Sequence, residues 1–386
     1  MDNCENYILT VQFKDVIGHE DAIRRLRQQV LADRLPHALM LSGPQGTGKM
    51  ALALALARLL VCKSLTADGE PCEACPGCRM SAAWTHPDLH FSFPVIKKKA
   101  TDQPVSDDFL EAWREQLLQT PYFSQDDWLR RLGGENEQMQ HFVGESDALQ
   151  RKLSLKSSQG GRRVVVQWLP EKMPEATANK LLKLIEEPPS HTHFILVSDH
   201  PDAVLGTIQS RTQRMHIGPL GETEIAQALV QRHGTEPDEA LRLAHLAQGS
   251  MTRALKQHEG EGEESLYLDI FISLMRLSYM RQVKEMRAWT ERVAALGRER
   301  QKHFLQYCQR MIRENFVLNF GLESRLNYMT AAESRFSQRF APFINERNVI
   351  AIMEALSDCE RDIEQNVQAR MVFFDFSVKL TILLKG

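Results

Sequence analysis

The stretch GPQGTGKM (43–50) constrains the fold of this chain more than any other segment. It follows the short apolar run HALMLS (37–42) and leads into MALALALARLLVC (50–62), which is apolar at nearly every position. A buried strand, a glycine-rich loop and a helix in this order form the setting in which a phosphate-binding loop folds. The segment therefore predicts an α/β domain built around such a loop.

Two further apolar runs extend this pattern along the chain. RRVVVQWL (162–169) and HFILVS (193–198) have the length and composition of buried strands. Between them lies a predicted helix, EATANKLLKLIEE (175–187), which ends before two prolines because a residue that precedes proline avoids the α region. Strands that alternate with helices predict a parallel sheet.

The last position of the loop departs from the phosphate-binding pattern G-x-x-x-x-G-K-[ST]. Gly43, Gly46, Gly48 and Lys49 are in place, so backbone N–H groups and one ammonium group are available to phosphate. Met50 stands where a hydroxyl binds magnesium, and a thioether is a poor ligand for that hard cation. The sequence predicts a degenerate loop without ATP hydrolysis and leaves the binding of ATP or ADP open.

Four of the seven cysteines fall within residues 62–78, with the spacing C-x9-C-x2-C-x2-C. They are Cys62, Cys72, Cys75 and Cys78. Two-residue spacers bring neighbouring thiolates to one tetrahedral ion, and four thiolates leave no open coordination position, so we predict a structural zinc site. Free thiols and a redox-active C-x-x-C pair are the alternatives, and two overlapping pairs fit the second poorly.

Composition and the first residues of the sequence limit the classes of protein to which this chain can belong. A net charge of −3 argues against a protein that binds nucleic acid over its whole surface, so any contact with DNA has to be local. The first residues lack a basic segment followed by an apolar one, so no signal peptide is expected. No apolar run approaches the ~18 residues of a membrane span. We therefore expect a cytoplasmic protein without membrane contacts.

At this point several segments together resemble one family, the delta-prime subunits of bacterial DNA polymerase III, in the clamp-loader branch of the AAA+ proteins. The segments are LPHALMLSGPQGTGK (35–49), the cysteine cluster, THPD (85–88), ANKLLKLIEEPP (178–189) and TIQSRT (207–212). The resemblance covers roughly 10–97 and 140–256. Residues 97–140 have no counterpart in it and indicate an insertion that is exposed at its start.

The resemblance implies three domains. Two form an AAA+ module, namely a P-loop α/β domain (1–217) that carries the zinc module (about 62–78) and a small helical lid domain (218–258). The third is an all-α collar domain (266–386), which ties subunits into a five-membered ring. The glycine- and glutamate-rich HEGEGEES (258–265) is the predicted linker before the collar.

The family pattern also implies that the catalytic residues are missing. Trp168 and Leu169 stand where the family has two acids that hold magnesium and the attacking water. Glu171 is the alternative acid, and on an extended segment it would lie about 7 Å beyond Leu169. In the lid, Thr252 stands where the family has an arginine that contacts the γ-phosphate. Arg253 follows one residue later, about 100° around the helix, and is expected to point elsewhere.

One functional residue of the family is retained. Arg211 matches the arginine finger, which in a ring points at the γ-phosphate held by the neighbouring subunit; Thr212 replaces the usual cysteine of this motif. A finger supplied in trans accelerates hydrolysis by ~10³–10⁵. From the residues alone, a surface arginine that caps a helix or pairs with an acid is the alternative interpretation. Ser198 takes the family's sensor-1 position and is expected to hydrogen-bond at the end of its strand.

These assignments imply a non-hydrolysing clamp-loader subunit that stabilises the ring and donates Arg211 to a neighbouring ATP site. The expected partners are the gamma/tau subunits, the delta subunit and, through the complex, the beta sliding clamp and primer–template DNA. The chain by itself is not expected to be an enzyme, although it would belong to the DNA polymerase III holoenzyme. A self-sufficient AAA+ ATPase is the main alternative, and a sequence-specific DNA binder with a zinc module is another.

Overall fold

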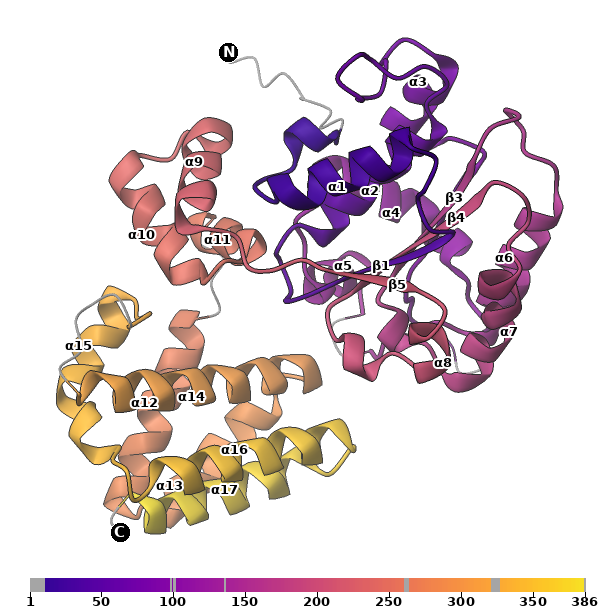
Figure 1. The fold of residues 1–386 in the computed structure, drawn as a ribbon. Helices are drawn as coiled ribbons and strands as arrows, with labels where there is room; N and C mark the ends of the chain where they lie inside the picture. The colour runs from indigo at the N-terminus through magenta and orange to yellow at the C-terminus, as the bar shows by residue number, and fades with distance from the viewer. Residues whose placement is uncertain are drawn as a thin grey trace, which may run out of the picture. The chain divides into compact units, whose positions relative to one another are not determined.

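The computed structural model describes residues 11–97, 99, 102–134, 137–259, 264–320 and 327–384. The chain divides into two compact units, Met1–Leu255 and Lys256–Gly386. Figure 1 shows an α/β unit followed by a helical one. Residues 260–263 of the predicted linker lie outside the described residues. Each unit has a hydrophobic core of its own.

A five-stranded parallel sheet forms the centre of the first unit, in the order β2-β3-β4-β1-β5. The strands are β1 (Ala38–Ser42), β2 (Leu89–Ser92), β3 (Arg163–Trp168), β4 (Thr192–Ser198) and β5 (Gln213–His216). Ser42 is paired with Ser198, and Leu39 with Gln213, so neighbouring strands end at the same edge. The predicted parallel sheet is confirmed, whereas β2 and β5 were not predicted.

Helices cover both faces of the sheet because successive strand side chains point to opposite sides. Leu39 and Leu41 pack on the face with α1 (Glu20–Leu31) and α2 (Lys49–Val61), while Met40 packs on the other face. That second face is covered by α6 (Val143–Ser154), α7 (Glu175–Glu186) and α8 (Gly206–Gln209) (Figure 1). Every residue of α2 is buried, which explains why its sequence is apolar on all sides.

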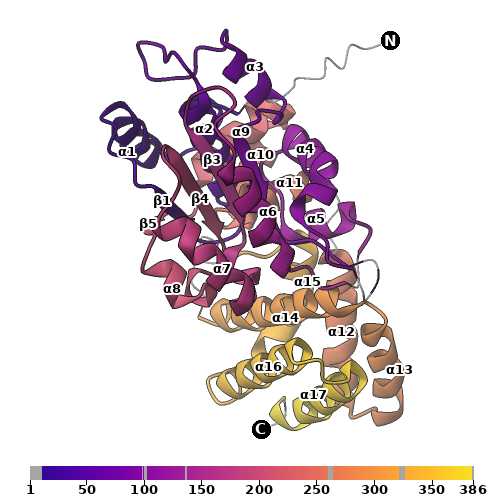
Figure 2. The same cartoon turned by 90° about the vertical axis from the view of Figure 1, so that its right-hand side faces the viewer.

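The insertion contributes to this core. Its helices α4 (Leu110–Gln119) and α5 (Gln125–Arg131) lie side by side (Figure 2) and bury Trp113 and Trp128. The Trp113 ring stacks on Phe93 at 4.1 Å and meets Trp128 edge-on at 5.0 Å. The charged composition of the segment gave no indication of this aromatic cluster. Exposure was expected at the start of the segment, and its helices are instead packed into the core.

Three helices complete the first unit. They are α9 (Glu222–His233), α10 (Pro237–Ala247) and α11 (Met251–His258). Ile225, Leu243 and Met251 belong to the same hydrophobic cluster as α2, so these helices share the core of the α/β domain. They occupy the segment assigned to the lid, and the domain boundaries at 217 and 258 stay predictions.

The second unit is helical throughout its described part. Its helices are α12 (Glu264–Met280), α13 (Val283–Ala294), α14 (Arg298–Leu318), α15 (Ala331–Phe340), α16 (Val349–Glu364) and α17 (Ala369–Leu383). Trp289, Phe304 and Phe373 meet in its core. Inside this core, Arg310 pairs with the buried Glu333, whose carboxylate also accepts a hydrogen bond from Tyr307.

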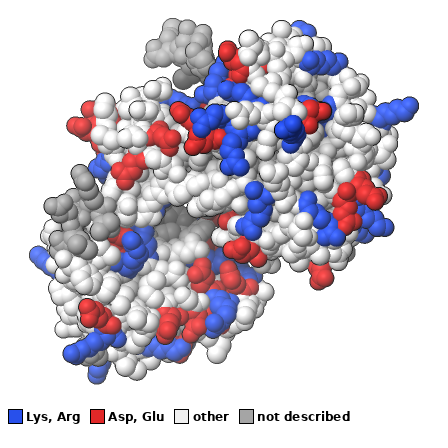
Figure 3. All heavy atoms as spheres, viewed as in Figure 1, with Lys and Arg blue, Asp and Glu red and all other residues white. Residues whose placement is uncertain are grey.

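The surface carries no dominant charge on the face shown in Figure 3, where basic and acidic side chains are interspersed over both units. This distribution agrees with the small net charge. Within the described ranges, no helix combines the length and the hydropathy needed to cross a bilayer.

Candidate functional site

The glycine-rich loop connects the carboxyl end of β1 to the first turn of α2. Gly46 and Gly48 have φ angles of 80° and 94°, which residues with a side chain rarely adopt. A Cβ atom on Gly46 would lie 2.0 Å from the Ser250 hydroxyl oxygen, and one on Gly48 would lie 3.2 Å from the Tyr122 ring. Both positions therefore require glycine for conformation and for close approach of other segments.

Lys49 of the loop pairs with an acid of its own chain. Its Nζ lies 2.8 Å from Oδ1 of Asp199 and also donates to the Pro44 carbonyl. The side chains of Lys49 and Asp199 are only 3% and 8% exposed. Asp199 was missed in the sequence, although it directly follows β4, whose carboxyl end lies beside that of β1. The ammonium group that would contact phosphate is thus neutralised inside the protein.

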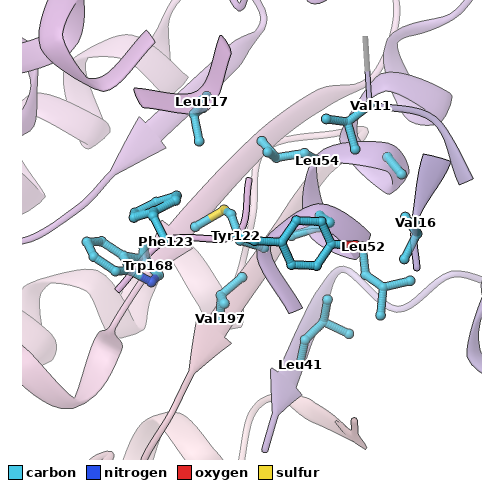
Figure 4. Packing of buried hydrophobic residues seen from close by; sticks show 14 of the residues in the cluster. Val11, Val16, Leu41, Leu52, Leu54, Leu117, Tyr122, Phe123, Trp168 and Val197 are labelled. Carbon is cyan, nitrogen blue, oxygen red and sulfur yellow. The ribbon is translucent and has the colours of Figure 1, made fainter. Parts of the chain in front are cut away.

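Tyr122, a residue of the insertion, fills the space beside the loop. Its hydroxyl oxygen accepts a hydrogen bond from the backbone N–H of Ile17 at 2.9 Å, and its ring lies among Val16, Leu41 and Leu52 (Figure 4). Burial raises the pKa of Tyr122 to about 12, so the phenol stays protonated at neutral pH. The insertion therefore fixes the N-terminal segment against the loop.

The helical part of the unit contacts the loop directly. The backbone N–H of Met251, at the start of α11, donates to the Gly46 carbonyl at 2.9 Å. Next to it, Thr252 is buried, and its hydroxyl has no hydrogen-bond partner among the described residues. The Arg253 side chain donates to Gln248 at 3.2 Å. Within the part of the chain that the structure describes, the Thr252 side chain thus makes no hydrogen bond to the glycine-rich loop, and the Arg253 side chain is bonded to Gln248.

Hydrophobic packing surrounds the end of β3, where the family resemblance led us to look for two acids. Trp168 is 4% exposed, and its ring lies 5.3 Å from Trp113 and 5.1 Å from Phe123, both from the insertion (Figure 4). Leu169 is fully buried and has a φ of 53°. An indole and an isobutyl group can neither bind a metal ion nor orient water.

The geometry expected for Glu171 was wrong. The chain is not extended beyond β3, because Leu169 turns it into the short 3-10 helix Pro170–Lys172. From there Glu171 reaches back to β4, where one carboxylate oxygen accepts hydrogen bonds from the backbone N–H groups of Asp199 and His200 at 2.9 and 3.0 Å. Glu171 therefore supports the turn that holds Asp199.

The hydrogen bond expected at Ser198 is not made by its side chain to any of the described residues. Its carbonyl accepts a hydrogen bond from Gly43 N at 3.4 Å, so the residue does bond at the end of its strand. Its hydroxyl is fully buried and has no partner among the described residues. The predicted hydrogen bond is thus made by the backbone alone.

The four predicted metal ligands converge at a separate place, between α2 and α3 (Pro76–Ala82). The Sγ atoms of Cys62, Cys72, Cys75 and Cys78 all lie within 4.8 Å of one another. A tetrahedral ion with Zn–S bonds of about 2.3 Å needs sulfur atoms about 3.8 Å apart, so a small contraction suffices. Burial opposes ionisation of Cys75, but hydrogen bonds from backbone N–H groups outweigh it and lower the pKa of this thiol to about 6.

This cysteine module is attached to the rest of the unit by two ion pairs. Arg58 of α2 is fully buried and donates to Glu73 at 2.7 Å and to the Val11 carbonyl at 3.3 Å. Arg27 of α1 pairs with Glu70. The module is therefore positioned against α1, α2 and the N-terminal segment, away from the glycine-rich loop.

Arg211 lies at the opposite end of the sheet from that loop. It precedes β5, whose residue Gln213 is paired with Leu39 near the start of β1. Its Nε donates to Glu186, and its Nη1 donates to the Thr207 carbonyl at 2.9 Å and to the Ser210 hydroxyl at 3.1 Å. These groups line an open hollow of about 740 Å³, which the start of β1 also borders.

A family model and several curated proteins match this chain. The family model described as "DNA polymerase III, delta subunit" matches residues 18–221. The DNA polymerase III subunit delta' of Pseudomonas aeruginosa is 32% identical over 227 residues, which are 58% of this chain and 56% of that protein. The subunit delta' of Escherichia coli is 29% identical over 233 residues, 60% of this chain and 57% of that protein.

A related subunit and two solved structures also match. The DNA polymerase III subunit tau/gamma of Haemophilus influenzae is 30% identical over 251 residues, 63% of this chain and 30% of that protein. A gamma subunit-related protein from Thermotoga maritima aligns over 94% of this chain and 99% of its own, with 12% identity and a TM-score of 0.38. The Thermotoga maritima RuvB Holliday junction branch migration motor aligns over 64% and 62%, with 14% identity and a TM-score of 0.37. The matched segment spans about half the length of the delta' relatives.

Proposed function

Since the chain belongs to the DNA polymerase III delta subunit family, we propose that it is a non-hydrolysing subunit of a bacterial clamp loader. It stabilises the loader ring and supplies Arg211 to the ATP site of the neighbouring subunit. The observation that carries this proposal is the position of Arg211, which sits at the end of the sheet that faces away from its own phosphate loop.

The length of β1 separates Arg211 from the loop. Ala38 borders the hollow with Arg211, and Ser42 precedes the loop at the other end of the strand. Four residue steps along a strand amount to roughly 13 Å, whereas a guanidinium-to-phosphate hydrogen bond needs about 2.8 Å. Arg211 is 36% exposed and lines an open hollow, so its target is a phosphate group that another chain brings.

The loop of this chain lacks the groups for hydrolysis. Met50 replaces the magnesium-binding hydroxyl and is buried in the core. Trp168 replaces an acid and packs against aromatic rings. Lys49 is held by Asp199 in a buried ion pair. We therefore propose that the loop has a structural role and connects the sheet, the insertion and the lid. A nucleotide would have to break the ion pair between Lys49 and Asp199 before it could bind to the loop.

The four cysteine thiolates supply a closed set of ligands, and we propose that they hold a structural zinc ion. When bound, the ion cross-links the loop after α2 to the start of α3, a segment with little apolar surface of its own. The proposed partners are gamma/tau-type subunits, a delta subunit, the beta sliding clamp and primer–template DNA. The assembly is proposed to act in the bacterial cytoplasm.

Reconstitution tests the proposal. The chain is combined with the gamma/tau and delta subunits of the same organism, and ATP turnover is measured with clamp and primed DNA. Arg211→Ala should remove the turnover of the neighbouring site, because a finger in trans contributes ~10³–10⁵ in rate. Arg214→Ala, which changes another exposed arginine three residues further along the chain, is the matched control and should leave turnover unchanged.

Two results would contradict this function. Undiminished turnover in a fully assembled Arg211→Ala complex would contradict the role of Arg211 as an arginine finger. Magnesium-dependent ATP hydrolysis by the isolated chain, abolished by Lys49→Ala in protein that is still folded, would instead support a self-sufficient AAA+ ATPase. Assembly is followed by size-exclusion chromatography, so that loss of activity is not confused with loss of the complex.

A further inference from the structure

We infer that Glu186 is a positioning residue for Arg211, orienting the guanidinium so that one nitrogen faces the phosphate of the neighbouring subunit. The inference rests on the proposed function and adds a second residue, on a different helix, to the same site. Glu186 is the last residue of α7, and Arg211 follows α8. Twenty-five positions separate the two residues in sequence, so the contact depends on the fold.

The hydrogen bonds of Arg211 leave one nitrogen unused. A guanidinium group carries five N–H donors, one on Nε and two on each Nη atom. Nε donates to Glu186, and Nη1 donates to the Thr207 carbonyl at 2.9 Å and the Ser210 hydroxyl at 3.1 Å. Nη2 has no hydrogen-bond partner among the described residues. Its two hydrogens are therefore available to an oxyanion that enters the hollow.

Three fixed contacts define the orientation of a planar group. The Thr207 carbonyl and the Ser210 hydroxyl both come from the turn of α8, immediately before Arg211. They would move with that turn. Glu186 is the only one of the three anchors on another helix, so it ties the guanidinium to the body of the sheet domain. Without it, the group can rotate about its side-chain torsions while Nη1 alternates between local acceptors.

The energy of this contact sets the size of the expected effect. The Arg211 and Glu186 side chains are 36% and 42% exposed, and such pairs contribute modestly because water competes. Loss of Glu186 should therefore reduce the fraction of correctly oriented Arg211 by about twofold to fivefold in the assembled site, far less than loss of the arginine itself. Binding of ATP by the neighbouring subunit does not depend on this orientation.

The test uses the reconstituted complex with clamp and primed DNA. The turnover that disappears in Arg211→Ala defines the contribution of the neighbouring site. Glu186→Ala should lower the kcat of this contribution about twofold to fivefold without raising the KM for ATP. Glu186→Gln keeps an oxygen that accepts a hydrogen bond from Nε, so it should retain at least half of the wild-type kcat. If Glu186 acted only through its negative charge, Glu186→Gln would lose as much activity as Glu186→Ala.

Glu187→Ala is the matched control, since Glu187 is the next residue and its exposed side chain makes no hydrogen bond to the described residues. It should behave as wild type. The double variant Glu186→Ala/Arg211→Ala should be no slower than Arg211→Ala alone, because the glutamate acts through the arginine. Assembly of every variant is checked by size-exclusion chromatography.

The outcomes separate the two proposals. If Arg211→Ala has no effect in an assembled complex, the arginine finger itself is wrong. If Arg211→Ala abolishes turnover while Glu186→Ala equals Glu187→Ala, the finger stands and the positioning role is overturned. A further loss in the double variant, or an increase in KM with unchanged kcat, would also overturn it.

Discussion

The buried ion pair between Lys49 and Asp199 predicts that the phosphate-loop lysine stabilises the folded protein. Its atoms lie 2.8 Å apart, and the side chains are 3% and 8% exposed. At that separation the attraction is about 6 kcal/mol for an effective dielectric constant of ~20, and most of it offsets the desolvation of both charges. Removing one partner leaves the other charge buried and unpaired.

We therefore expect Lys49→Met to lower the free energy of unfolding of the first unit by about 3–5 kcal/mol, and Asp199→Leu to do the same. The double variant Lys49→Met/Asp199→Leu removes both charges and should be at least about 2 kcal/mol more stable than the sum of the single effects implies. Arg24→Met, which breaks an exposed pair with Asp21, is the control and should cost less than about 1 kcal/mol.

Urea unfolding followed by tryptophan fluorescence measures these effects. Trp84, Trp113, Trp128 and Trp168 are all buried in the first unit, so the signal reports mainly on it. The second unit contributes Trp289 alone. A loss below about 1 kcal/mol for Lys49→Met, or strict additivity in the double variant, would refute the reasoning.

Three other predictions concern the first unit. Trp113→Ala should lower its unfolding free energy by about 3–5 kcal/mol, because Trp113 stacks at 4.1 Å on Phe93 inside a closed core; a urea midpoint close to that of the wild type would contradict this. Elemental analysis should find one zinc per chain, and Cys78→Ser should abolish it; metal content well below one in the purified wild type would contradict the site. Burial lowers the pKa of His141 to about 4, although its hydrogen bonds to the Trp168 and Leu169 carbonyls act in the opposite direction. The unfolded chain, in which the pKa is about 6.5, therefore binds the proton more readily than the folded chain. The free energy of unfolding should fall as the pH decreases from about 6.5 to 4. His141→Gln should flatten that part of the pH–stability profile measured by thermal unfolding, and an unchanged slope would count against it.

Local sequence signals predicted the parts of the structure that short segments determine. The apolar runs at β1, β3 and β4 and the proline stop after α7 need only local patterns, and the spacing of the cysteines brings their sulfur atoms together. The role of Asp199 depends on which strand neighbours β1, a relation that the strand order sets and that no local pattern carries. The rule that carboxyl ends of parallel strands meet at one edge would have identified it once that order was known.

The insertion shows which contacts local sequence patterns do not predict. Trp113 and Trp128 are separated by charged and polar residues, so periodicity gave little indication that they pack on each other and that Trp113 packs on Trp168, which is distant in sequence. Glu171 was misjudged because the prediction extended β3 beyond the point where Leu169 turns the backbone. The interpretation of Arg211 as an arginine finger came from the family resemblance and stays a prediction, and its contact with Glu186 depends on how α7 and α8 pack.

The aromatic rings around Trp168 leave the end of β3 poorly suited to an acidic side chain. An aspartate at this position would have its carboxylate beside Trp113 and Phe123, and an unpaired buried charge costs several kcal/mol. Accommodating an acid there would require the inserted helices to withdraw from the core. The packing of the insertion thus determines which side chains the end of β3 can carry.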